Sequence, residues 1–213
     1  MAATSALQHL VDTVEAALEK YPASGGTSLE DQRSVCEAVA PALTALVNDP
    51  SAIPAAAKEP LEGAAIGNLL HADARGRFHV LAVVFPEGTS SGIHHHGCWG
   101  VIGYLQGGDE ETRYRAASDT GDQAQLAEAS RHVWHQGDVT FLLAPDEGWH
   151  RVRNPGPGPG VSVHVLCRTP ADHPHRYWDR RSGAVLPFPF VEVAPGRWRA
   201  QVSPTTPSSP QSG

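Results

Sequence analysis

The sequence predicts a mainly β protein, either a closed barrel or a sandwich, that is preceded by α-helices. From residue 66 onward, short apolar runs rich in β-branched and aromatic residues alternate with clusters of Gly, Pro, Asp and Asn. Such runs are typical of strands and too short for stable helices. The chain also contains 21 Gly and 18 Pro residues, which favours a fold with many tight turns.

The first sixty residues predict two helices. Apolar residues recur there at steps of three and four, which places one apolar stripe on a helix; they are Leu7, Leu10, Val11, Val14, Ala17 and Leu18. Ser28 and Asp31 resemble a capping box that opens a second helix, along which Val35 and Val39 face the core. Pro41 is expected to end that helix or to begin another. We expect the helices to brace a larger unit and to carry no chemistry.

Four apolar runs are the clearest strand candidates, at 78–85, 99–105, 139–144 and 161–167. Turn signals occur at 86–92, 106–110, 118–122, 144–148 and 154–160. Strands at this spacing, without helices between them, predict a barrel or a sandwich. We divide the chain into a helical section over 1–62 that packs on the barrel, a β domain over 63–202, and a tail over 203–213. The tail lacks apolar residues and is expected to be disordered.

Composition excludes several classes of protein. Of 213 residues, 40% are hydrophobic and 18% charged, and the net charge is −7 without a run of Lys or Arg, so no nucleic-acid partner is expected. No stretch approaches the roughly 18 apolar residues of a membrane span, and no basic segment precedes an apolar one at the N-terminus. Three distant cysteines, Cys36, Cys98 and Cys167, suggest reduced thiols. We expect a cytoplasmic protein, monomeric or weakly homo-oligomeric.

Histidine is the unusual component, with twelve copies. His94, His95 and His96 open a strand after the turn at 86–92. Because successive side chains of a strand point to opposite faces, His94 and His96 share a face. An H-x-H pair facing into a barrel can offer two imidazoles to one metal ion. A polar strand end with solvated histidines is the alternative interpretation.

A second segment favours the metal interpretation. Gly137 and Asp138 begin a strand, Pro145 turns it, and His150 and Asn154 follow. This G-D…P…H-x-x-x-N arrangement, downstream of an H-x-H, resembles the paired motifs of the cupin superfamily. The resemblance implies a double-stranded β-helix, or jelly-roll, barrel. It also implies that His94, His96 and His150 converge on one metal from neighbouring strands.

The expected donor set contains no carboxylate. Many cupins add a Glu four or five positions after the H-x-H, where this chain has Gly100 and Val101. Three protein ligands leave open positions on the ion, as in catalytic sites. Three neutral imidazoles also leave its +2 charge, which favours an anionic ligand such as a thiolate. Imidazole suits Zn, Cu, Fe and Ni, so the ligand type does not choose the metal.

Four stretches together resemble the cysteine dioxygenase family of thiol dioxygenases, particularly its bacterial branch that includes 3-mercaptopropionate dioxygenases. They are SGIHHHGCWGVIGYLQGGDEETRY (91–114), GDVTFLLAPDEGWHRVRN (137–154), SVH (162–164) and YWDRRSG (177–183). The resemblance implies Fe(2+) held by His94, His96 and His150, a small thiol and O2 as substrates, and a sulfinic acid as product. It further implies Ser162 and His164 as a catalytic outer-sphere pair, which strand alternation places on one face.

The chain departs from the family pattern at several positions. Leu166 occupies the place of a tyrosine that belongs to the outer-sphere relay. Either Tyr104 or Tyr177 substitutes for that tyrosine, or the chemistry runs more slowly or differently. Gly67 or Asn68 occupies the place of an Arg or Gln that grips the substrate carboxylate. Either the substrate is therefore not ordinary cysteine, or another residue such as Arg168 binds its carboxylate. Tyr104 and Trp99 are also expected to contact the substrate, Trp99 as part of an apolar wall that excludes water.

Two further departures concern neighbouring positions. His95 stands where the family usually has Asp, on the outward face, where it has little effect or orients a ligand imidazole. The cysteine that animal members cross-link to tyrosine falls near Val101 and is unmatched, since Cys98 lies three residues earlier.

The remaining histidines are expected to be ordinary. His132 and His135 fall on opposite faces of a strand. His173 and His175 lie in a loop that is expected to be solvated, with a position at the mouth of the pocket as the alternative. Two alternatives to the thiol dioxygenase stay open. One is a cupin metalloenzyme that uses Ni, Mn or Zn on a non-thiol substrate, and the other is a non-catalytic cupin that binds a metal or a ligand.

Overall fold

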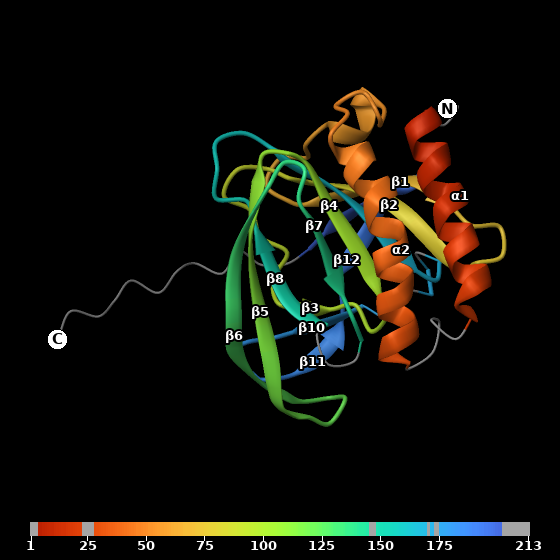
Figure 1. Cartoon of the computed structure of the whole chain (residues 1–213). Coiled ribbons are helices and arrows are strands. Elements are labelled where there is room, and N and C mark those ends of the chain that lie inside the picture. Colours follow the sequence, from red (N-terminus) through yellow and green to blue (C-terminus); the bar gives the residue numbers. More distant parts are fainter. Residues whose placement is uncertain (1–3, 23–27, 145–147, 170, 173–174, 202–213) are drawn as a thin grey trace.

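The computed structural model describes residues 4–22, 28–144, 148–169, 171–172 and 175–201 (Figure 1). Its helices are α1 (Ser5–Lys20), α2 (Leu29–Val47) and the short 3-10 helix η2 (Ala55–Lys58). Its strands are β1 (Ile66–Ala72), β2 (Phe78–Phe85), β3 (His94–His95), β4 (Gly100–Gln106), β5 (Gly108–Asp119), β6 (Ala124–His135), β7 (Val139–Leu142), β8 (Trp149–Arg153), β9 (Gly160–Cys167), β10 (Arg176–Trp178), β11 (Val185–Pro187), β12 (Phe190–Ala194) and β13 (Arg197–Ala200).

The two predicted helices are confirmed, but the prediction for Pro41 is wrong. The Ser28 side chain caps α2 by accepting a hydrogen bond from the backbone N–H of Asp31, and α2 then runs through Pro41 without a break. Pro41 and Glu37 both lie on the exposed face, so water can solvate the Glu37 carbonyl that Pro41 leaves without a donor. The apolar stripe continues on the opposite face and holds the helix together.

The strands form two sheets that face each other as a barrel. One sheet has the order β12-β13-β1-β2-β9-β4-β7 and the other the order β11-β10-β3-β8-β5-β6. Every pairing between these strands is antiparallel. This confirms the mainly β class and the double-stranded β-helix. In Figure 1, α1 and α2 lie together over the sheet that contains β2 and β4, while the long β5–β6 hairpin lies on the far side.

Local patterning located some strands well and others poorly. The runs at 78–85 and 161–167 correspond closely to β2 and β9, and those at 99–105 and 139–144 overlap β4 and β7. The β5–β6 hairpin escaped prediction as a pair of long strands, although the turn signal at 118–122 lies at its tip. Most of β6 is exposed and polar, so it carries little of the alternation that marks a half-buried strand.

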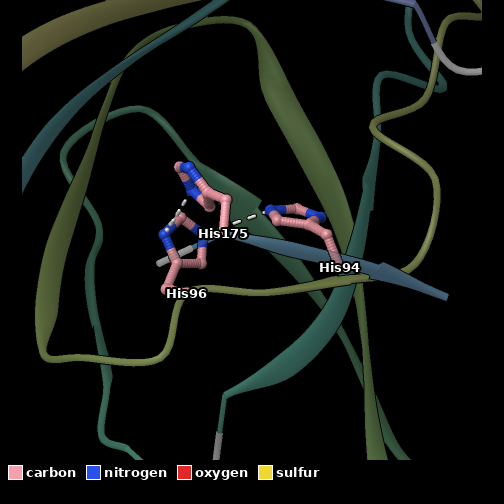
Figure 2. A group of neighbouring side chains, drawn as sticks. All are labelled: His94, His96 and His175. Carbon is pink, nitrogen blue, oxygen red and sulfur yellow. Dashed lines mark hydrogen bonds between the residues drawn. The ribbon is translucent and has the colours of Figure 1, made fainter. Parts of the chain in front are cut away.

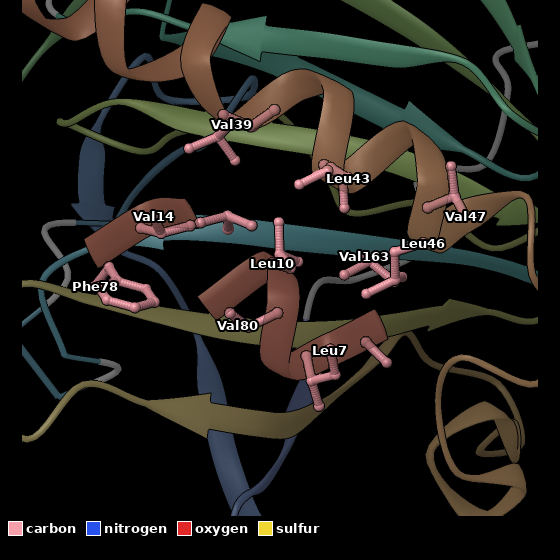
Figure 3. Close-up of a cluster of buried hydrophobic side chains, with 14 of the residues drawn as sticks. Leu7, Leu10, Val14, Val39, Leu43, Leu46, Val47, Phe78, Val80 and Val163 are labelled. Carbon is pink, nitrogen blue, oxygen red and sulfur yellow. The ribbon is translucent and has the colours of Figure 1, made fainter. Parts of the chain in front are cut away.

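A single apolar core joins the helices to the barrel (Figure 3). Residues from α1, α2, β2, β4 and β9 belong to one buried cluster; those labelled in Figure 3 are Leu7, Leu10, Val14, Val39, Leu43, Leu46, Val47, Phe78, Val80 and Val163. On β9, residues 161, 163, 165 and 167 face this core. The residues between them therefore face the barrel interior, because side chains alternate along a strand.

The prediction that all three cysteines are reduced is wrong for two of them. A disulfide joins Cys98, just after β3, to Cys167 at the end of β9, with Cα atoms 6.2 Å apart. The two cysteines are 69 residues apart along the chain, so the sequence did not indicate that they pair. Only the folded barrel brings the segment after β3 to the end of β9. Cys36 is a free thiol, and its burial against the barrel raises its pKa to about 12.

Some expectations lie outside the described residues, namely those for Pro145, His173 and the tail over 203–213. Among the described helices, none has both the length and the apolar character needed to cross a membrane. The division at residue 62 stays a prediction, although α1, α2 and η2 all precede the first strand. The cytoplasmic location also stays a prediction, and the Cys98–Cys167 disulfide removes one of its grounds.

Candidate metal centre

Three histidines meet inside the barrel because of one strand pairing. In the antiparallel register of β3 and β8, His94 lies directly opposite His150, and directly opposite residues of such a pair share a face. His96 follows two residues after His94 and returns to the same face. All three side chains are buried, with His150 fully inaccessible to solvent.

The three Nε2 atoms form an equilateral triangle with sides of 3.1 Å. Its corners lie about 1.8 Å from its centre, so one ion at a metal–nitrogen distance of about 2.1 Å can touch all three. Burial and the neighbouring His150 hold the pKa of His94 well below its usual range, which favours the neutral imidazole that binds metals. The residues present therefore fit a metal ion.

Each ring is held from behind through its Nδ1 atom. That of His94 is 3.3 Å from the carbonyl oxygen of Gly92, and that of His150 is 2.8 Å from Glu111 Oε1. Both partners are acceptors, so these Nδ1 atoms carry the hydrogen and the Nε2 lone pairs point inward. Nδ1 of His96 lies 2.9 Å from Nε2 of His175. Where His96 Nδ1 donates to His175, all three Nε2 lone pairs point inward, which is the electrostatic pattern that a cation completes.

Glu111 on β5 is a functional candidate that the sequence analysis missed. It is 1% exposed, and it accepts hydrogen bonds from His150, from Trp134 Nε1 at 2.9 Å and from Arg113 Nε at 3.2 Å. Burial alone would raise its pKa, but its bonds with His150 and Trp134 and the Arg113 charge outweigh burial and lower the pKa to about 2. A permanently charged carboxylate behind a ligand imidazole fixes its orientation and raises its basicity.

His175 is the second residue that the sequence analysis misplaced. The prediction of a solvated loop position is wrong, because His175 is partly buried and lies against His96 (Figure 2). Arg176 pairs with His95 in the register of β10 and β3, so the preceding residue, His175, falls beside His96. Only this pairing of distant segments could have revealed it.

Two sets of three histidines could hold a metal, since the ligand atoms of His94, His96 and His175 also lie within 4.8 Å of one another. We favour the set with His150, because its three Nε2 atoms are mutually 3.1 Å apart. His175 instead meets His96 at Nδ1, on the side away from that triangle, and is therefore placed to orient His96 rather than to replace His150.

The predicted outer-sphere pair lies on the opposite sheet. Ser162 and His164 are buried on β9, with Ser162 Oγ 2.9 Å from His164 Nε2. Leu166 follows on the same face. His164 and Leu166 line a cavity of about 110 Å³. The three histidines of the Nε2 triangle, called the triad below, also line this cavity. The phenol of the family pattern is absent from this wall, and an apolar side chain takes its place.

The structure does not bring the three expected substrate contacts to this cavity. Arg168 and Trp99 line a separate pocket beside α1, because β9 turns outward after Cys167 and Trp99 belongs to the core under the helices. Tyr104 lies opposite Ser162 but stacks on Trp134, with ring centroids 5.7 Å apart. Neither Tyr104 nor Tyr177 is among the described residues that line the cavity, so these placements do not support substrate contact.

His95 does not face solvent. It is 2% exposed, packs edge-on against Trp149 with ring centroids 5.1 Å apart, and accepts the backbone N–H of Gly97 at 2.7 Å. A side chain at Gly148 would collide with the His95 ring. The backbone at position 148 therefore packs against this ring, and only glycine fits there. His95 therefore shapes the turn after His96.

Asp109, two residues before Glu111, is buried with Oδ1 unpartnered among the described residues, and burial raises its pKa to about 7. The folded protein then holds a proton that the unfolded chain loses near pH 4, so stability falls as pH rises from about 4 to 7. The loss reaches at most about 4 kcal/mol, from three pKa units at 1.36 kcal/mol each. In urea melts at pH 5 and pH 8, Asp109→Asn is expected to remove this loss.

Asp122→Asn, at an exposed position, is the matched control and should leave the pH profile unchanged. The comparison is the difference between the wild-type and variant profiles. Parallel profiles would contradict the assignment to Asp109.

The chain resembles known proteins in sequence and in fold. The family model of cysteine dioxygenase type I matches residues 65–181, which is more than half of the chain. Among solved structures, it is similar to a Cupin 2 conserved barrel domain protein from Salinispora arenicola, with 22% identity over 56% of this chain and 87% of that chain and a TM-score of 0.39. A protein with a double-stranded β-helix domain from Klebsiella pneumoniae matches with 19% identity over 55% and 87% of the two chains and a TM-score of 0.36.

Barrel and site together define a cupin with a buried cluster of histidines that fits a metal ion. The chain belongs to the cysteine dioxygenase type I family.

Proposed function

We propose that the protein is a non-haem iron thiol dioxygenase that adds both atoms of O2 to the sulfur of a small thiol. The reaction is balanced as written: a thiol and O2 give a sulfinic acid, with sulfur oxidised by four electrons and O2 reduced by four. The observation that carries the proposal is the triangle of Nε2 atoms from His94, His96 and His150, open toward a cavity. Membership in the family supports the choice of reaction.

In the proposal, His94, His96 and His150 hold the ferrous ion. The ion supplies the oxygen chemistry when bound. Because the three ligands are neutral, a thiolate is the substrate form that compensates the metal charge. Gly92, His175 and Glu111 keep the rings oriented from behind.

We assign binding of the substrate to the wall of the cavity that β9 contributes, opposite the three histidines. His164 borders the cavity and is held by Ser162, so it can donate or accept a hydrogen bond at the substrate without leaving its place. The apolar remainder of the wall limits the access of water to the reacting atoms. Chain residues therefore contribute positioning and exclusion of solvent.

The test is oxygen consumption by the iron-loaded protein with a panel of thiols under 18O2. We expect uptake with at least one thiol and a sulfinic acid that carries two labelled oxygen atoms by mass spectrometry. Incorporation of one labelled atom, or turnover of only non-thiol substrates, would overturn the proposal. A protein loaded with Zn in place of Fe is the matched control and should not consume O2.

A further inference from the structure

We propose that the thiol used by this site carries no charged group and that its organic part is a short apolar chain. This inference rests on the proposed function and names its substrate class. The reaction is unchanged: the thiol and O2 form two S–O bonds, and the thiol proton is released to solvent from the resulting sulfinic acid.

The wall of the cavity is the first ground. Beyond the histidines and Ser91, every described lining residue is apolar, and none is Asp, Glu, Lys or Arg. The larger apolar residues of the lining are Leu81, Val83, Leu166, Phe188, Phe190 and Trp198. A carboxylate or ammonium in this cavity would lose its hydration and would meet imidazoles and one hydroxyl but no described side chain that forms an Arg, Lys, Asp or Glu ion pair, which disfavours charged ligands.

The nearby arginines do not reach the cavity. On β13, Trp198 lines it, whereas Arg197 takes the alternate face and donates from Nε to Asn68 Oδ1 at 2.8 Å. Arg176 on β10 binds Asp119 at 3.1 Å. Arg168 lines the separate pocket beside α1. Among the described residues, strand alternation therefore turns Arg197 away from the cavity, an acidic partner holds Arg176, and Arg168 lies in a different pocket.

Position 67 shows why a carboxylate finds no anchor. Of the two residues that the sequence left open, Gly67 lines the cavity, while Asn68 points outward and donates to the Ala57 carbonyl at 3.1 Å. A Cβ at Gly67 would lie 3.8 Å from Leu81 Cδ1 and 4.0 Å from the Trp198 carbonyl oxygen, which is ordinary contact. The cavity therefore has room for a side chain at position 67, but glycine supplies none.

The volume of the cavity favours a small substrate. A cavity of about 150 Å³ holds benzene, and this one measures about 110 Å³. By that comparison, about four non-hydrogen atoms of the occupant fit inside the cavity. Short alkanethiols meet both the size and the polarity of the wall.

The deciding experiment compares an uncharged thiol with two charged thiols, using the iron-loaded protein. 1-Propanethiol and cysteamine have the same number of non-hydrogen atoms and differ in charge, and 3-mercaptopropionate adds a carboxylate. We expect kcat/KM for 1-propanethiol to exceed both others by at least tenfold. Anaerobic titration of cobalt-substituted protein, followed by its thiolate absorption band, should give the same order of binding without turnover.

Gly67→Arg introduces a positive charge into the apolar wall of the cavity. It should raise binding of 3-mercaptopropionate at least tenfold in the cobalt titration and lower that of 1-propanethiol. Gly67→Met, similar in length and uncharged, should not favour the carboxylate.

Faster oxidation or tighter binding of a charged thiol by the unmodified protein would overturn the inference and leave the proposed function intact. Absence of both oxidation and binding for every thiol would overturn the proposed function itself.

Discussion

Replacing His94 with alanine is expected to abolish iron binding and oxygen consumption together. His94 supplies one of three Nε2 atoms that stand 3.1 Å apart, and two imidazoles cannot hold the ion in place of three. Loss of a partner behind a ligand already costs about 10–100-fold in metal affinity, so loss of a ligand should cost more. The measurement is metal content after dialysis, together with affinity from competition with a chelator.

His135→Ala is the matched control, because His135 is exposed at the end of β6 and should keep full iron content. Circular dichroism of both metal-free variants separates loss of the site from loss of the fold. A folded His94→Ala protein that retains stoichiometric, tightly bound iron would exclude His94 as a ligand.

Glu111→Gln is expected to weaken metal binding by about 10–100-fold while the barrel stays folded. Gln keeps the shape of the side chain and an oxygen that can accept the His150 Nδ1 hydrogen. It removes the negative charge that raises the basicity of the imidazole and that Arg113 and Trp134 also contact. The affinity for Fe(2+) and Zn(2+) should fall in parallel, because the effect acts through His150 and not through one metal.

Glu110→Gln provides the control, since Glu110 neighbours Glu111 on β5 and its nearest described ion pairs, at 3.8–3.9 Å, are with Arg151 and Arg131. Its affinity for metal should match that of the unmodified protein. Equal affinities for the Glu111 and Glu110 variants would show that the carboxylate serves the barrel core and not the metal centre.

Those parts of the fold that produce a local periodicity of apolar residues could be predicted from the sequence. The helical stripe of α1, the Ser28 cap of α2 and the apolar runs of β2 and β9 follow from steps of 3.6 or two residues. Pro41 was mispredicted because its local effect is weaker than packing of the whole helix. The exposed strand β6 has few buried positions, so no period marks it.

The sequence by itself determined that His94 and His96 share a face, as do Ser162 and His164, because alternation along a strand requires no partner. Their spacing and the family resemblance named His150. Only the tertiary structure decided that Glu111 and His175 stand behind the triad, that Cys98 joins Cys167, and that Gly67 rather than Asn68 borders the cavity. These outcomes depend on which strands pair and in which register, and that choice minimises the free energy of the whole barrel rather than of any one segment.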